Sequence, residues 1–81
     1  MNFEKVINEV NEIFIDVLDN DDIELKSETT ADDIEDWDSL THIELIVEIE
    51  KHFNIKFTLV EVQGFKNVGE MCEAIVKKVN A

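Results

Sequence analysis

The amino-acid sequence predicts an all-α fold: a small antiparallel four-helix bundle with three longer helices, one short helix and a long acidic loop between the first two. Two observations predict it. The 81 residues include no proline and two glycines, and apolar residues recur at helical spacing along most of the chain. This length suffices for one modest hydrophobic core, so we expect a single domain over residues 1–81.

The composition excludes several kinds of partner. Seven basic and twenty acidic side chains give a formal net charge of −13, so nucleic acids and anionic membrane surfaces would repel the protein. The charge favours partners with basic patches. No apolar run approaches the roughly 18 residues that span a bilayer, and the single cysteine suits a reducing compartment. We therefore expect a cytoplasmic monomer without a membrane partner.

The first helix is expected over residues 2–18, where the apolar residues form one stripe. The next segment, residues 19–37, is expected to be a long loop that Ile23, Leu25, Ile34 and Trp37 anchor to the core. Residues 16–38 hold eleven acids and one lysine. An EF-hand calcium loop is excluded because this region contains no glycine.

The second helix is expected over residues 39–53. Asp38 is a suitable N-cap, and Ser39 falls in the first turn with its hydroxyl towards solvent. The partial positive charge and free N–H donors at a helix start would stabilise a phosphodiester on Ser39. The simpler interpretation is that Asp38 and Ser39 only cap the helix.

Two stripes are expected along this second helix. The inward stripe contains Leu45, Ile46, Ile49 and Phe53, with His42 among them. The outward stripe mixes apolar and acidic side chains, and is either ordinary surface or a docking surface. Its members are Leu40, Ile43, Glu44, Val47, Glu48, Glu50 and Lys51.

Capping pairs delimit the last two helices. Thr58 and Glu61 form a capping box for a short helix over residues 58–63, which we expect Gly64 to stop. Asn67 and Glu70 have the same spacing at the start of a helix over residues 68–79. Cys72 lies on the apolar stripe of this last helix, which indicates a core thiol.

No self-contained active site is expected. Ser39 and His42 are one helical turn apart, but His42 falls on the core side and nothing supplies an oxyanion hole. His52, near the end of the second helix, is expected to be a surface cation. Two histidines and one cysteine are too few for a transition-metal cage. The sequence therefore indicates neither an enzyme nor a metal site.

The sequence resembles the acyl carrier protein family over nearly all of its length. Asp38-Ser39-Leu40 opens the second helix, followed by an Ile-Glu-Leu run that ends at Phe53, and Val68 matches the valine of the last helix. The resemblance implies that Ser39 carries 4′-phosphopantetheine, which a phosphopantetheinyl transferase supplies from coenzyme A, with Asp38 as the cap beside it. Acyl or aminoacyl groups would be held on this arm as thioesters.

The resemblance also implies how partners and cargo meet the carrier. Acyl-transferring or acyl-activating enzymes with basic docking patches would bind to Leu40, Ile43, Glu44, Val47 and Glu48. Short or medium acyl chains would lie between the helices near Leu45, Ile46, Leu59, Val62 and Phe65.

Three departures from the family pattern favour a specialised carrier over the housekeeping fatty-acid carrier. Trp37 precedes Asp-Ser-Leu where a glycine or small residue is usual, the second helix ends in Glu50-Lys51-His52 where an acidic run is usual, and Leu59-Val60 follows Thr58 where acidic residues are usual. The alternative function is an unmodified acidic helical module that binds a basic protein partner.

Overall fold

The computed structural model of the chain describes residues 2–80 and is all-α over that range. Met1 and Ala81, the ends of the expected domain, lie outside the described residues. Each helix begins and ends within one residue of its expected bounds. The elements are α1 (Phe3–Leu18), a one-turn 3-10 helix η1 (Ala31–Asp33), α2 (Ser39–Phe53), the short α3 (Leu59–Gly64) and α4 (Val68–Val79).

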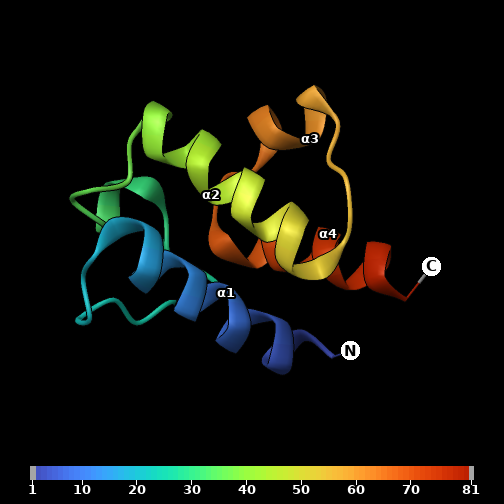
Figure 1. The fold of residues 1–81 in the computed structure, drawn as a ribbon, viewed down its shortest axis with the longest axis horizontal. Helices are drawn as coiled ribbons and strands as arrows, with labels where there is room; N and C mark the ends of the chain where they lie inside the picture. Colours follow the sequence, from blue (N-terminus) through green and yellow to red (C-terminus); the bar gives the residue numbers. More distant parts are fainter. Residues whose placement is uncertain (1, 81) are drawn as a thin grey trace.

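The hydrophobic core lies between α1, α2 and α4. α1 packs against both of the other long helices, which run back in the opposite direction (Figure 1). The long loop adds Ile23, Leu25 and Trp37 to this core, as the sequence indicated, while Ile34 is half-buried. The helices contribute the other buried side chains, which are Val6, Val10, Phe14, Leu18, Leu45, Ile46, Ile49, Val68, Met71, Cys72 and Ile75.

One expectation about a helix end was wrong. Gly64 does not stop α3 from outside but is its last residue, and neither glycine has a positive φ. The left-handed conformation occurs instead after α1 and α2, at Asp19 (φ 52°) and Asn54 (φ 56°). Short polar side chains tolerate this conformation because they can bond to the local backbone.

The long loop is held at two places. The Asn11 side chain of α1 donates to the carbonyl of Ile23 at 3.3 Å and accepts the N–H of Leu25 at 2.7 Å. Further along, the first N–H groups of α4 donate to loop carbonyls, from Val68 to Thr29 and from Gly69 to Ser27, both at 2.8 Å. Loop and helix thus satisfy backbone groups that each would otherwise leave unpaired.

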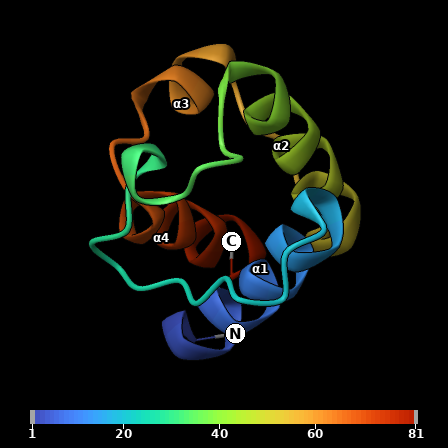
Figure 2. The same ribbon diagram turned by 90° about the vertical axis from the view of Figure 1, so that its left-hand side faces the viewer.

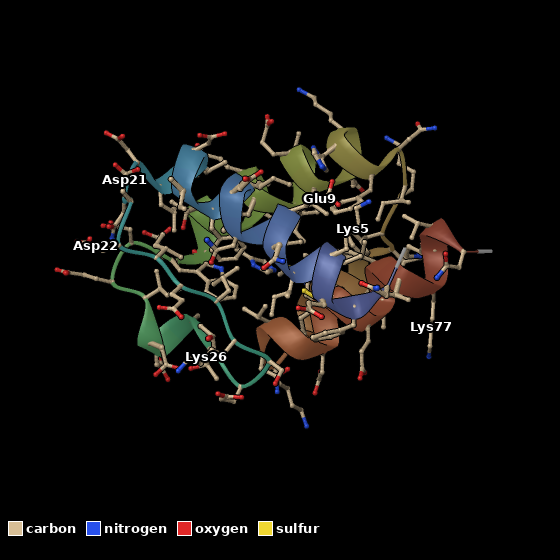
Figure 3. The ribbon with its side chains drawn as sticks, turned by 90° about the horizontal axis from the view of Figure 1, so that it is seen from below. Lys5, Glu9, Asp21, Asp22, Lys26 and Lys77 are labelled. Atoms are coloured by element: carbon tan, nitrogen blue, oxygen red, sulfur yellow. The ribbon has the colours of Figure 1, made fainter. Side chains whose placement is uncertain are left out.

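The charged side chains are distributed unevenly around this frame. Asp21 and Asp22 lie at the tip of the loop at one end of the molecule, whereas Lys77 of α4 lies at the other end (Figure 3). The acidic loop and the start of α2 lie at the same end of the molecule (Figure 1).

The burial of Trp37 fixes the chain just before α2. Its ring meets the ring of Phe14 edge to face, with centroids 4.9 Å apart and an interplanar angle of 89°. Trp37 is 8% exposed, while Ser39, two residues later, is exposed to solvent. The chain therefore leaves the core at Trp37 and enters the helix at once.

Asp38 turns the chain into α2 as its N-cap, as expected. Its carboxylate accepts the N–H of Leu40 at 3.0 Å and the N–H of Thr41 at 2.9 Å. The Asp38 N–H in turn donates to the Thr41 hydroxyl at 2.8 Å, which completes a capping box. The Thr41 N–H, helped by the Leu40 N–H, lowers the pKa of the Asp38 carboxyl from its ordinary 3.8.

A substitution at Gly69 tests the packing of loop on α4. A Cβ at this position would lie 2.8 Å from the Ser27 carbonyl oxygen, so the loop backbone must move. We expect Gly69→Ala to lower the free energy of unfolding by about 1–3 kcal/mol, as overpacking does. Urea unfolding followed by Trp37 fluorescence measures it.

Gly64→Ala is the matched control, since a Cβ there meets no atom within 4 Å. We expect it to be neutral or stabilising by up to about 1 kcal/mol, because alanine favours helix over glycine. Equal destabilisation by the two variants would contradict the close approach at Gly69.

The Asp38 cap predicts a pH-dependent stability. Because folding lowers its pKa, the ionised carboxylate stabilises α2 above the ordinary pKa, and this stabilisation is lost as the pH falls through the lowered value. Asp38→Asn keeps an acceptor but does not titrate. We expect the wild type to exceed Asp38→Asn in stability at about pH 7 and to match it in strong acid.

Asp36→Asn controls for the change in net charge, because the Asp36 side chain is exposed and outside the cap. Urea midpoints of the three proteins over the pH range measure the effect. A difference between wild type and Asp38→Asn that did not depend on pH, or that Asp36→Asn reproduced, would contradict the assignment.

Candidate functional site

Ser39 is the first residue of α2 and is exposed, as the sequence predicted. Within residues 2–80 its hydroxyl makes no hydrogen bond, so the oxygen is free to react. The hydroxyl is carried by a helix whose start is fixed by the two residues before Ser39, the buried Trp37 and the Asp38 cap. Ser39 therefore combines a rigid backbone with an accessible oxygen.

At the start of α2, fewer N–H donors are free to bind an anion than the sequence predicted. Two of the first-turn N–H groups, those of Leu40 and Thr41, already donate to the Asp38 carboxylate. They are not free donors for an anion on Ser39. Such an anion gains from the partial positive charge of the helix start but lies close to the Asp38 charge.

A groove of about 470 Å³ opens beside Ser39 between α2 and α3. Figure 2 shows the end of the molecule where α2 begins, with α3 across from it. Three of the five residues expected near an acyl chain line this groove, namely Leu59, Val62 and Phe65. The other two, Leu45 and Ile46, are core residues with 0% and 5% exposure and are not among its walls.

The inner wall of the groove is a hydrogen-bonded chain of three residues. The Trp37 indole N–H donates to His42 Nδ1 at 3.1 Å. Because that nitrogen accepts, the proton of the neutral imidazole is on Nε2, which donates to the Val62 carbonyl at 3.2 Å. Both ring nitrogens of His42 are thus engaged away from Ser39, and no serine–histidine dyad is assembled.

Sequence reasoning did not find this chain of bonds. It treated Trp37 as a core anchor and His42 as a packed residue, both correctly, but as separate features. The spacing of five residues between Trp37 and His42 is only a weak indication that their side chains bond to each other. The Val62 carbonyl is twenty residues from His42, so reasoning from neighbours along the chain could not find that bond.

Most of the outward stripe of α2 is exposed, but Glu50 is half-buried and accepts the Phe57 N–H at 2.8 Å. Leu40 is 71% exposed, Ile43 54% and Val47 41%, and the Glu44 and Glu48 side chains are also exposed. Ile43 and Val47 also form a shallow hollow of about 570 Å³ with α1, and acidic side chains border it. These are Asp16, Glu44 and Glu48.

Other reactive side chains lie away from Ser39. Burial raises the pKa of the Cys72 thiol to about 12, so it is a core residue and no nucleophile, as expected. His52 is exposed, as the sequence indicated, and in addition bonds the Glu9 carboxylate of α1 at 2.8 Å. Within residues 2–80, no group of three or more His, Cys, Asp or Glu side chains could hold a metal ion.

Comparisons with known proteins agree with this geometry. The family model for the phosphopantetheine attachment site matches residues 8–75. An acyl carrier protein of Streptococcus thermophilus (strain CNRZ 1066) is 37% identical over 73 residues, which cover 90% of this chain and 95% of that protein. One of Cyanidium caldarium is 40% identical over 43 residues, which cover 53% of this chain and 50% of that protein.

A solved structure has the same fold. The solution NMR structure of the holo acyl carrier protein from Geobacter metallireducens matches with a TM-score of 0.88 and 45% identity, over 93% of this chain and 86% of that one. None of the described helices is long and apolar enough to cross a membrane. The chain belongs to the acyl carrier protein family, and it is a carrier with a phosphopantetheine prosthetic group rather than an enzyme.

Proposed function

We propose that Ser39 is the residue that carries the phosphopantetheine, and that the protein presents acyl or aminoacyl groups to partner enzymes. The observation that supports this most is the exposed, unbonded Ser39 hydroxyl at the fixed start of α2. When bound, the group supplies a terminal thiol that holds the cargo as a thioester. The chain itself holds the attachment point rigid and leaves it open to solvent.

Attachment requires that the Ser39 oxygen form a bond to the phosphorus of coenzyme A that bears the pantetheine. The bond from that phosphorus to the adenosine bisphosphate part breaks, and adenosine 3′,5′-bisphosphate leaves. The hydroxyl proton passes to a base on the phosphopantetheinyl transferase, because His42 is engaged with Trp37 and Val62.

A second serine provides a comparison within the chain. Ser27 and Ser39 are its two serines, and both are exposed. The Ser27 hydroxyl donates to the neighbouring Glu28 carboxylate at 3.1 Å, in the loop rather than on a helix. Exposure alone therefore does not distinguish them, whereas the place of Ser39 at a helix start and its unbonded hydroxyl do.

We assign partner docking to the outward stripe of α2, that is Leu40, Ile43, Glu44, Val47 and Glu48. Exposed apolar side chains supply contact area, and the carboxylates attract a basic patch. The hollow beside Asp16, Glu44 and Glu48 fits a lysine or arginine side chain, whose aliphatic stem would lie on Ile43 and Val47. Glu48 is the weaker contact of the two, because Lys51 lies 3.9 Å from it.

The same proposal treats residues 1–81 as one monomeric carrier domain in the cytoplasm. One core shared by the loop and the three long helices supports the single domain. The buried, free Cys72 thiol is compatible with a reducing compartment.

The attachment site is tested by intact mass after incubation with coenzyme A and a promiscuous phosphopantetheinyl transferase. We expect a gain of about 340 Da, the mass of one phosphopantetheine group, for the wild type and for Ser27→Ala. We expect no gain for Ser39→Ala. A modified Ser39→Ala protein would contradict the site, and an unmodified wild type would favour the alternative of an unmodified module with a basic partner.

The docking assignment is tested by the rate of this modification. We expect Glu44→Lys to lower kcat/KM of the transferase for the carrier about tenfold at low salt, with a smaller loss at high salt. Glu73→Lys on α4 makes the same change in charge on an exposed residue outside the stripe, and should stay within about twofold. Equal losses would indicate an effect of net charge alone.

A further inference from the structure

We propose that the groove beside Ser39 accepts a short cargo only, because Trp37, His42 and Val62 close its way into the core. The proposal rests on the attachment of the arm to Ser39. It names the class of acyl group that this carrier can shelter, and it concerns residues other than the attachment site.

The walls of the groove separate it from the interior. Among residues 2–80, Trp37, which is 8% exposed, belongs to the buried core and lines the groove, and the partly buried Val62 and Phe65 that line it pack against that core. Leu45, Ile49 and Met71 have no exposed surface and do not line it. None of the fully buried core side chains among residues 2–80 lines the groove, so we take the Trp37 ring as its inner end.

Three elements are tied together at this inner end. The His42 ring stacks on Trp37 with centroids 5.9 Å apart and an interplanar angle of 25°. The bonds from Trp37 to His42 and from His42 to the Val62 carbonyl join the loop, α2 and α3. An acyl chain that entered the core here would have to separate α3 from α2 or displace the Trp37 ring.

Breaking these bonds is unfavourable in an apolar surrounding. An alkyl chain has no donor or acceptor, so it would leave the indole N–H and the Val62 carbonyl without partners. If the acyl group does not enter the core, these bonds stay in place, and a short cargo lies on the outer walls of the groove, Leu59 and Ile43. A long alkyl chain would then extend past the groove into solvent, so the geometry points to a short acyl or aminoacyl group.

The experiment compares cargo lengths on the whole chain. A promiscuous transferase loads Ser39 from acetyl-, butyryl-, octanoyl- and dodecanoyl-coenzyme A, and intact mass verifies each product. Two readouts follow: the Tm, and the indole ¹H–¹⁵N NMR signal of Trp37, the single tryptophan of the chain. Each buried methylene would raise the Tm by about 3 °C or more in a domain of this size.

For the wild type we expect the octanoyl and dodecanoyl forms to melt within about 3 °C of the butyryl form, with the indole signal unmoved. His42→Ala removes both bonds and the stacked ring. In this variant the octanoyl form should melt about 6 °C or more above the butyryl form of the same variant. Comparison within one variant cancels the effect of the substitution on folding.

Two further variants make the result specific. Trp37→Phe keeps an aromatic ring in the core but has no indole N–H, and should also gain stability with cargo length. His52→Ala removes the other histidine, which lies outside the groove and bonds Glu9, and should behave as the wild type does.

A Tm of the wild type that rises steadily to the dodecanoyl form, or an indole signal that shifts with cargo length, would overturn the proposal. So would His42→Ala and Trp37→Phe variants that both remain insensitive to cargo length. Failure to load Ser39 appears earlier, as an unchanged mass, and would overturn the proposed function together with this inference.

Discussion

The burial of Trp37 is the contact on which the site depends. A large aromatic side chain stabilises a fold strongly when it is removed from water, and here it packs edge to face on Phe14 of α1. Since Asp38 and the first turn of α2 follow directly, the position of Trp37 decides where α2 begins. The exposure of Ser39 and the inner wall of the groove are both consequences of this one anchor.

The charge of the molecule acts at longer range than this anchor. Most of the net charge of −13 lies in the loop that leads to α2, and the outward stripe of α2 adds further carboxylates. If partners dock as proposed above, this charge would draw their basic patches to the end of the molecule that presents Ser39. The exposed apolar residues of α2 and α3 then offer contact area at short range, where Leu59 and Val60 are 69% and 80% exposed.

The sequence predicted those features that depend on neighbours along the chain. Helix starts at Asp38, Thr58 and Asn67 were correct because a cap and the N–H groups it accepts lie within three residues of one another. The exposure of Ser39 followed from its place in the first turn. The attachment of the arm to that serine stays a prediction, since family membership alone does not identify the modified residue.

Features that depend on how helices meet were beyond such reasoning. The bond of His42 to Val62 and the Gly69 contact with Ser27 join residues far apart in the sequence. Of the five residues expected near an acyl chain, Leu59, Val62 and Phe65 line the groove, whereas Leu45 and Ile46 are buried in the core and do not line it. A helical wheel shows which side chains of one helix face inward, but it does not show which of them a neighbouring helix covers.

The most direct test of the central claim is a comparison of ¹H–¹⁵N NMR spectra of the apo and holo proteins, with resonances assigned. If Trp37 holds Ser39 outside the core as the attachment point, the shifts on modification should concentrate in the first turn of α2, at Ser39, Leu40 and Thr41. The amides of α1 and the Trp37 indole should remain in place. Large shifts across the α1 core residues, or changes centred on another segment, would contradict this account.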